Sequence, residues 1–322
     1  MPVRTRGFSR CLRLAALMCV ASSATLRAQS ITAQQVIDRI KANVGVPWTL
    51  PTVDTIKAGD AGTPVTGIAV TMMATFDVLQ RAAREGKNFV ITHEPTFYDH
   101  LDSTGTLVRE SDAVTAAKLK FIAAHHMVVW RFHDYAHRMR PDIIMTGVVR
   151  ALGWSAWQDR ATPWRFHMPA TTLAVLADSI RRKLGAHAMR VVGDPMLSVS
   201  ELMLVPGAAG FPTHRLAMRD TTVQVLVIGE AREWETVEYI DDAIAAGQRR
   251  ALIIIGHIPS EQPGMEDATR WLQSFVKDVP VGFVPANDPF WTPASLPTTQ
   301  TSAPRDATAP SAASPARPRR PD

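Results

Sequence analysis

The sequence is poor in cysteine. Only two of its 322 residues are cysteine, Cys11 and Cys19. Both lie within residues 1–28, where four arginines precede a short apolar core and Leu26-Arg27-Ala28 resembles a cleavage pattern, as in a secretory signal peptide. We therefore expect residues 1–28 to be removed on export to the periplasm or the cell exterior. The mature chain would then contain no disulfide, thiolate metal site or cysteine nucleophile.

Long hydrophobic runs are missing after residue 30, so no membrane span is expected once the signal is cleaved. The sequence also lacks the Gly-x-Ser-x-Gly elbow of serine hydrolases and the Gly-Lys-Ser/Thr pattern of phosphate-binding loops. Serine-based acyl transfer and nucleoside triphosphate binding therefore have no support from motifs.

The formal net charge of +5 comes from the two ends of the chain. Residues 1–28 contribute five arginines and no acid, and residues 301–322 contribute four arginines and two aspartates. The body is left at about −2, so it offers no broad basic surface of the kind that binds nucleic acid. Residues 292–322 are Pro, Ala, Ser, Thr and Arg with almost no large apolar residue, a composition typical of a disordered tail.

The body alternates short apolar runs with helical patterns, which predicts an α/β fold with largely parallel strands. Strands are predicted at 65–70, 88–92, 127–131, 189–192, 202–205, 223–228 and 251–255. Helices are predicted at 32–45, 76–85, 112–125, 143–152, 171–184 and 235–246.

Three of the predicted strands end in imidazole and carboxylate side chains. The last of them, residues 251–255, is followed by Gly256 and then by His257 and Glu261. The others lead into His93-Glu94-Pro95 and His133-Asp134-Tyr135-Ala136-His137. The carboxyl ends of buried parallel strands are where α/β proteins place ligands. We therefore expect the three polar endings to converge.

Imidazoles and carboxylates without sulfur suit Zn, Mn, Fe, Ni or Co better than Ca or Mg. Five or more candidate ligands exceed the needs of one tetrahedral ion, which favours two ions that share a hydroxide and hydrolyse phosphoryl or amide-like bonds. A single His at a strand end is more often a hydrogen-bonded loop residue. It is the repetition at three strand ends that favours a metal site.

Other polar residues carry a weaker signal. His125 and His126 end a predicted helix, where a cation complements the dipole. The turn 207–210 indicates tight packing more strongly than an anion cradle, and Glu230 and Glu233 are either acids behind the site or an exposed helix start. The remaining imidazoles have no partner at ligand spacing: His100, His167, His187 and His214.

The three endings resemble the motifs of the NIF-three-like dinuclear metal-centre family, also called type 2 GTP cyclohydrolase I, and the resemblance spans residues 32–291. It implies a ligand set of three imidazoles and two carboxylates: His93, Glu94, His137, His257 and Glu261. The family has a second His where this chain has Glu94, and an Asp where it has His137. This reciprocal exchange preserves ligand number and charge, and we expect Glu94 to replace the missing Asp as a bridging or charge-neutralising group.

The resemblance also implies two similar α/β lobes, with mixed and largely parallel sheets and the metal site between them. We expect the lobes at residues 31–153 and 154–291, a homo-oligomer that is a hexamer in the family, and two divalent ions, Zn, Mn, Fe or Ni. His133 is expected to face substrate or to support the ligands, and Asp134 is the alternate ligand; both are the candidate catalytic residues.

Together these features predict an exported dinuclear metalloprotein, a hydrolase in which a metal-bound hydroxide attacks a small-molecule substrate. An exported protein meets little GTP, so GTP is not an expected substrate. The alternative is a metal-binding or oligomeric scaffold protein without catalysis.

Overall fold

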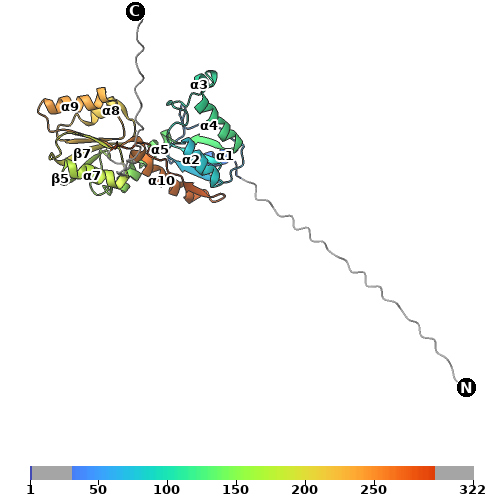
Figure 1. Cartoon of the computed structure of the whole chain (residues 1–322). Helices are drawn as coiled ribbons and strands as arrows, with labels where there is room; N and C mark the ends of the chain where they lie inside the picture. Colours follow the sequence, from blue (N-terminus) through green and yellow to red (C-terminus); the bar gives the residue numbers. More distant parts are fainter. Residues whose placement is uncertain (2–30, 294–322) are drawn as a thin grey trace, which may run out of the picture.

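The computed structural model describes Met1 and residues 31–293 of the chain (Figure 1). Apart from Met1, the predicted signal peptide lies outside the described residues, as does all but the beginning of the predicted tail. Within the described ranges, no helix is both long enough and apolar enough to cross a membrane.

The first lobe is built on a mixed sheet of five strands in the order β1-β4-β3-β2-β10. Its strands are β1 (Ile56–Ala58), β2 (Ile68–Thr71), β3 (Phe89–Thr92), β4 (Val128–Arg131) and β10 (Val281–Phe283). All neighbours run parallel except β1, which is antiparallel to β4. Every residue of β2, β3 and β4 is buried, which explains why they are continuous apolar runs rather than alternating ones.

The described residues of this half of the chain form six helices, of which α1 to α5 are labelled in Figure 1. They are α1 (Ala33–Asn43), α2 (Phe76–Arg84), α3 (Gly105–Arg109), α4 (Ala113–Ala124), α5 (Asp134–Arg138) and α6 (Ile143–Leu152). Helix α1 begins at the capping box formed by Thr32 and Gln35. The short α5 directly follows β4, so it carries the second polar ending from the edge of the sheet.

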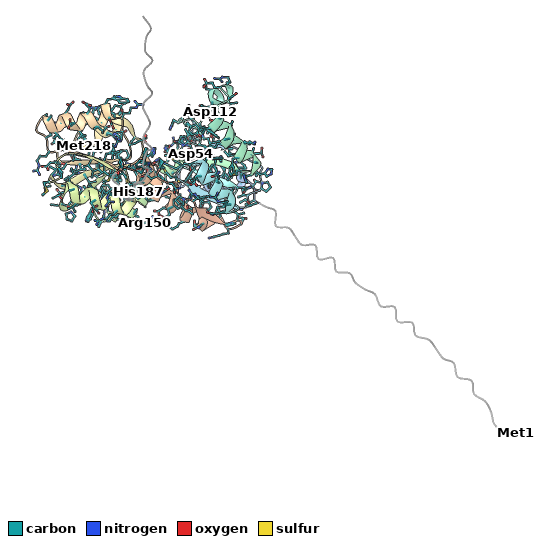
Figure 2. The ribbon with its side chains drawn as sticks, viewed as in Figure 1. Met1, Asp54, Asp112, Arg150, His187 and Met218 are labelled. Atoms are coloured by element: carbon teal, nitrogen blue, oxygen red, sulfur yellow. The ribbon has the colours of Figure 1, made fainter. Side chains whose placement is uncertain are left out.

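The second lobe has its own mixed sheet in the order β5-β7-β8-β9-β6. Its strands are β5 (Arg165–Thr172), β6 (Arg190–Val192), β7 (Ser198–Val205), β8 (Val225–Ile228) and β9 (Ala251–Ile254). The central three are parallel, and β5 and β6 are antiparallel to their neighbours. Its helices are α7 (Leu173–Leu184), α8 (Gly210–Ala217), the π-helical turn η1 (Glu233–Val237) and α9 (Glu238–Ala245). The predicted class, two α/β lobes with mixed sheets, is confirmed. Figure 2 shows Asp54 in the first lobe and Met218 in the second.

The chain returns to the first lobe after β9. Helix α10 (His257–Phe275) buries Met265, Ala268 and Leu272 in the first lobe's core, and β10 then pairs with β2. Residues 257–291 are predicted in the second lobe, but they pack into the core and sheet of the first, so this part of the predicted division is wrong. Two prolines concealed the helix. Pro259 lies in its first turn, where no intrahelical N–H is needed, and Pro263 lies further inside.

Candidate metal centre

The three polar endings converge at one place, where the carboxyl edge of the first sheet meets the first turn of α10. His93 and Glu94 follow β3, and Gly256, with φ of +106°, turns the chain from β9 into α10. The cluster comprises all five predicted ligands and one further imidazole: His93, Glu94, His133, His137, His257 and Glu261.

Each of the two carboxylates faces three imidazoles. Glu94 Oε1 lies 3.9 Å from His93 Nε2, 3.6 Å from His133 Nε2 and 3.4 Å from His257 Nε2. Glu261 Oε2 lies 3.6 Å from His93 Nε2 and 3.1 Å from His257 Nε2, and its Oε1 lies 3.9 Å from His137 Nε2. His93 and His257 thus contact both acids. Each of the other two imidazoles contacts one acid.

His93 has the environment of a metal ligand. It is fully buried, and its Nδ1 lies 3.1 Å from the backbone oxygen of Phe132. Because that oxygen can only accept, Nδ1 carries the proton and Nε2 presents its lone pair to the two carboxylates. Nε2 is buried and has no hydrogen-bond partner among the described residues. An orphaned acceptor among carboxylates fits a cation.

Two other imidazoles, His137 and His257, also have an acceptor at Nδ1 that leaves Nε2 facing the carboxylates. Asp142 Oδ2 lies 3.0 Å from Nδ1 of His137, and Glu230 Oε2 lies 3.3 Å from Nδ1 of His257. A carboxylate behind an imidazole fixes its tautomer and raises its basicity as a ligand. Of the two readings left open for Glu230, the structure favours the acid behind the site. Glu233 is instead an exposed partner of Arg190.

His133 and Asp134 have different places in the cluster. His133 joins His93 and His137 in a group whose ring nitrogens lie within 4.8 Å of one another. Asp134 lies behind it: its carboxylate contacts Nδ1 of His133 and accepts from the Thr52 hydroxyl and the Val53 N–H. Asp134 therefore orients His133, and the structure does not bring it into the candidate ligand groups.

Two buried charges that the sequence analysis missed hold the cluster in place. Asp54 accepts the N–H groups of His133, Asp134 and Tyr135, which fixes the start of α5. Arg131 is fully buried: its Nε donates to the backbone oxygen of His93, and its Nη2 lies 3.4 Å from Glu94 Oε2. The position of Arg131, a charged residue at the end of an apolar strand, was the feature of the sequence that could have indicated its role. Asp54 lies in an irregular segment, and its partners are about 80 positions away in sequence.

Glycines and a serine make room for Glu261. A Cβ on Gly207, where φ is +69°, would lie 2.3 Å from Glu261 Oε1, and one on Gly229 would lie 2.5 Å from the backbone oxygen of Gly207. The Ser260 hydroxyl accepts the Gly207 N–H and donates to the His257 oxygen. The turn 207–210 therefore serves close packing here, as its composition indicated.

The charges of the cluster depend on one another. Burial and the neighbouring imidazoles of His133 and His137 lower the pKa of His93 well below its usual value. Burial alone would raise the pKa of Glu94, but its bond with His257 and the nearby imidazoles lower it. Burial opposes charge on His257 too, yet hydrogen bonds to Glu230, Glu261 and Glu94 raise its pKa to about 12. The Glu94 carboxylate thus remains charged and available to a cation.

The other histidines lie outside this cluster. His167 pairs with Glu201 and Asp159 at the surface of the second lobe, and His125 ends α4 against Phe121. His100 adjoins the cluster: its ring lies edge-on to that of His133, with centroids 6.1 Å apart, and its backbone oxygen accepts from Arg131.

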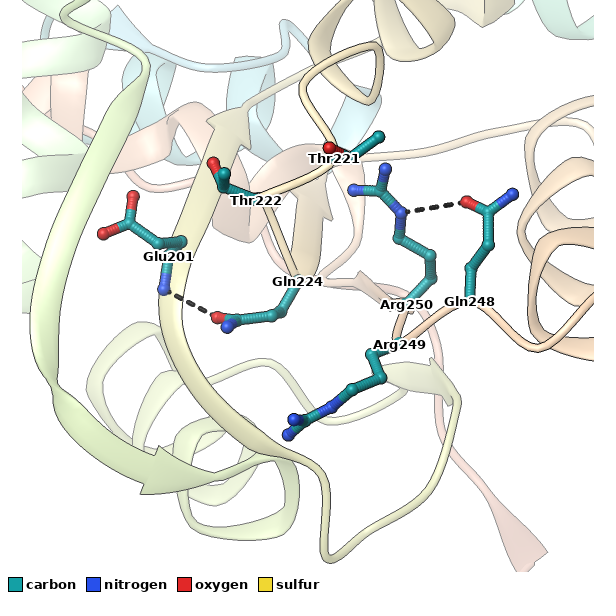
Figure 3. A pocket seen from close by; sticks show the side chains of 7 residues that line it. All are labelled: Glu201, Thr221, Thr222, Gln224, Gln248, Arg249 and Arg250. Carbon is teal, nitrogen blue, oxygen red and sulfur yellow. Dashed lines mark hydrogen bonds between the residues drawn. The ribbon is translucent and has the colours of Figure 1, made fainter.

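Two cavities lie at opposite edges of the second sheet. One of about 1110 Å³ adjoins the cluster and is lined in part by Glu230, Gly256 and His257. The other, of about 500 Å³, lies where β8 and β9 begin and is lined by polar groups (Figure 3). There Arg250 bonds to Gln248 and to backbone oxygens, and Gln224 accepts from the N–H of Glu201. This second cavity is remote from the three polar endings.

Comparison with known proteins finds one family model that matches part of the chain. Residues 159–289 match the model of the DUF34/NIF3 (NGG1p interacting factor 3) family, a range that includes the Gly256–Glu261 motif. The match supports the NIF3-like family that the motifs indicated. The endings at His93 and His137 lie outside the matched range. No match was found among curated proteins.

Solved structures share the fold at low sequence identity. Protein SA1388 of Staphylococcus aureus is 16% identical with a TM-score of 0.63, and the alignment covers 82% of this chain and 100% of that one. A Bacillus cereus protein related to NIF3 is 12% identical with a TM-score of 0.63 and the same coverage. Reduced HcgD of Methanocaldococcus jannaschii is 12% identical with a TM-score of 0.52, covering 80% and 98%. These likenesses extend over both lobes.

Proposed function

We propose that the cluster binds two divalent transition-metal ions and that the chain is an exported, metal-dependent hydrolase of small molecules. The observation that carries the proposal is the meeting of four imidazoles and two carboxylates, in which His93 and both carboxylates are buried and His93 Nε2 has no partner among the described residues. Nitrogen and oxygen ligands without sulfur suit Zn, Mn, Fe or Ni.

Two ions suit the geometry better than one. Two ligand groups are present, one of His93, His133 and His137 and the other of His93, Glu94 and Glu261. Nδ1 of His93 is committed to the Phe132 oxygen, so the single lone pair on Nε2 can serve only one group at a time. The other group then retains its remaining side chains and can draw on His257, which contacts both acids.

Bound divalent ions would polarise a substrate oxygen and lower the pKa of water to near neutrality. The chain's own part is to hold charge and orientation. Glu94 stays ionised beside Arg131, and Asp134 fixes the ring of His133. The His133 side chain is 23% exposed, so it can meet a substrate at the rim of the cluster.

A turnover assay separates hydrolysis from metal binding alone. Full-length protein with Mn or Zn is offered phosphoesters, nucleotides and cyclic amides, alongside His257→Ala and the control His187→Ala, an exposed imidazole of the second lobe. We expect turnover of at least one class by wild type and by the control, and a loss of at least 100-fold in His257→Ala. Bound metal without turnover across the panel would leave the non-catalytic scaffold as the function.

Export and assembly are part of the proposal and rest on sequence and family alone. We expect N-terminal sequencing to show that the secreted protein begins at Gln29. Light scattering should give the mature chain the mass of a homo-oligomer, with six chains expected. A secreted protein that starts at Met1 would contradict cleavage of a signal peptide, and a monomer would contradict the homo-oligomer. Neither result bears on the metal centre.

A further inference from the structure

The cavity of about 1110 Å³ beside the cluster is lined by one candidate ligand, His257, and otherwise by residues outside the cluster, so its position suggests a role in binding substrate. Its floor is the carboxyl end of β9, where Ile255 and Gly256 lead to His257. Helix α8 and η1 form one wall, and the segment 288–290 forms another. Met73 of the first lobe also lines it, so the cavity lies at the junction of the two lobes.

The chemistry of the lining is that of a small-molecule pocket. Apolar side chains dominate it, among them the rings of Phe211 and Phe290. Phe290 is 65% exposed, an unfavourable state for a large ring that a flat ligand would relieve. Ligand pockets generally combine such walls with a few convergent polar groups, in volumes of roughly 300–1,000 Å³.

One of those polar groups lacks a partner. His214 on α8 is 1% exposed, and its Nδ1 lies 2.8 Å from the hydroxyl of Thr236 in η1. Its Nε2 is buried with no partner in the described part of the chain. A buried polar atom left unpaired lowers the stability of the fold, a cost that an apolar residue of similar size would avoid. Thr236 also lies in a π-helical turn, an element frequent at functional sites.

We propose that this cavity binds the substrate of the metal centre, an aromatic small molecule whose hydrogen-bonding group pairs with His214 Nε2 while its reactive end lies at His257. The placement of the reactive end rests on the proposed hydrolase function. The binding of an aromatic ligand through His214 does not.

The His214 imidazole can pair with either a donor or an acceptor on the ligand. Burial lowers the pKa of His214, so the ring is neutral near neutral pH. If Nδ1 donates to Thr236, then Nε2 accepts from the ligand. If the Thr236 hydroxyl donates instead, then Nε2 carries the proton and donates.

The test uses 8-anilinonaphthalene-1-sulfonate, an aromatic probe with hydrogen-bonding groups and no hydrolysable bond. Its fluorescence is titrated with full-length wild type, His214→Phe and Ala208→Trp, in which the new ring occupies the cavity. His167→Phe is the matched control, the same substitution at an exposed histidine of the same lobe. We expect saturable binding by wild type and control, and at least fivefold weaker binding by both cavity variants.

Thermal unfolding separates a binding role from a structural one. A binding role predicts that His214→Phe loses affinity while its Tm falls by no more than that of the control. If both cavity variants bind the probe as tightly as wild type, the cavity is not the aromatic site and the inference is overturned. Because the probe is not turned over, this outcome is distinct from failure of the hydrolase proposal, which the turnover assay reports.

Discussion

Hydrogen bonds behind the four clustered imidazoles decide which ring nitrogen meets the carboxylates. In every case Nδ1 is taken by an oxygen outside the cluster and Nε2 faces inward. The pairs are His93 with the Phe132 oxygen, His133 with Asp134, His137 with Asp142 and His257 with Glu230. Such outer partners typically change metal affinity 10- to 100-fold when removed. Four rings oriented alike indicate a site organised in advance of its ion.

Asp142 offers the sharpest test of this orientation. Its Oδ2 contacts Nδ1 of His137, while its Oδ1 accepts the N–H groups of Ile144 and Met145 at the start of α6. Asp142→Asn keeps the helix cap but places an amide donor against Nδ1. We expect metal affinity, measured by competition with a chelating dye, to fall about 10- to 100-fold.

Asp112→Asn is the control, since Asp112 caps α4 through Thr115 and has no imidazole partner. Its metal affinity should equal that of wild type, and both variants should unfold at similar temperatures. An unchanged affinity in Asp142→Asn would show that its carboxylate does not orient a ligand.

The sequence predicted the members of the cluster better than the residues that support them. His257 and Glu261 could be predicted because two residues four positions apart lie on one face of a helix or within one turn after a strand. Asp142 and Asp54 were not, because they look like ordinary helix-cap and loop acids and only folding brings them to the cluster. Glu230 stayed ambiguous, because neither its exposure nor its partner can be read from its neighbours.

Lys118, which donates to the backbone oxygen of Thr96 and is not a member of the cluster, provides a pH test. Burial lowers the pKa of this lysine to about 8, against an attraction to Asp102 that raises it. Because its pKa in the folded chain lies below the unfolded value, the unfolded chain holds the extra proton as pH rises above 8. Stability therefore increases with pH in that window. Between pH 8 and 10 the free energy of unfolding of wild type should rise by about 2 kcal/mol relative to Lys118→Met. Parallel pH profiles of the two proteins in urea titrations would contradict this assignment.

The element that joins the two lobes is the crossing of α6 and α10. The helices approach so closely that a Cβ on Gly147 would lie 2.5 Å from the backbone of Gly264, and one on Gly264 would lie 2.4 Å from Ile144 Cα. Helix α6 begins at Asp142, which contacts His137, and α10 carries His257 and Glu261 in its first turns. The distance between the two helices therefore sets the distance from His137 to His257 and Glu261.

Gly264→Ala should disturb both packing and site. The added methyl meets backbone, which cannot rotate away, so the helices must separate. We expect a loss of about 1–3 kcal/mol in the free energy of unfolding, typical of overpacking. Metal binding should weaken as well, because Glu261 moves relative to His137.

Gly105→Ala is the matched control, since its new Cβ would meet only the end of Arg109 at 3.5 Å. That variant should retain both stability and metal affinity. If Gly264→Ala behaves like the control, the close approach of α6 and α10 is not what holds the ligands together.

At this scale the sequence predicted most buried strands and missed α10. Strands such as β3 and β9 are short apolar runs that only a buried parallel sheet accommodates. The residues from His257 onward contain two prolines and a glycine, which local propensity reads as irregular chain. The apolar face of α10 against the first lobe outweighs that propensity, and it could be recognised only with the partner surface in view.

Over the whole molecule, the cluster lies where the chain passes from one sheet to the other. His93 and Glu94 extend from the first sheet, while His257 follows directly from the second through Gly256. A ligand held by both strand ends should stabilise the folded chain. Without a metal ion, Arg131 and His257 compensate the two buried carboxylates, and burying such charges remains costly.

Removal of metal by a chelator should therefore lower the thermal stability of wild type. An ion present at 100 times its dissociation constant stabilises by about 2.7 kcal/mol, or about 5–10 °C in Tm for a chain of this size. His93→Ala should show no such chelator effect. An equal Tm for wild type with and without chelator would mean that no ion is tied to the fold.

The most direct test of the central claim is the metal content of the purified chain. Elemental analysis after equilibration with Mn or Zn and desalting should give two divalent ions per chain of wild type. The Glu94→Ala, His137→Ala double variant should retain fewer than half as many ions, since it loses one member of each of the two candidate ligand groups. Wild type without metal, or a double variant with an unchanged content, would contradict the account.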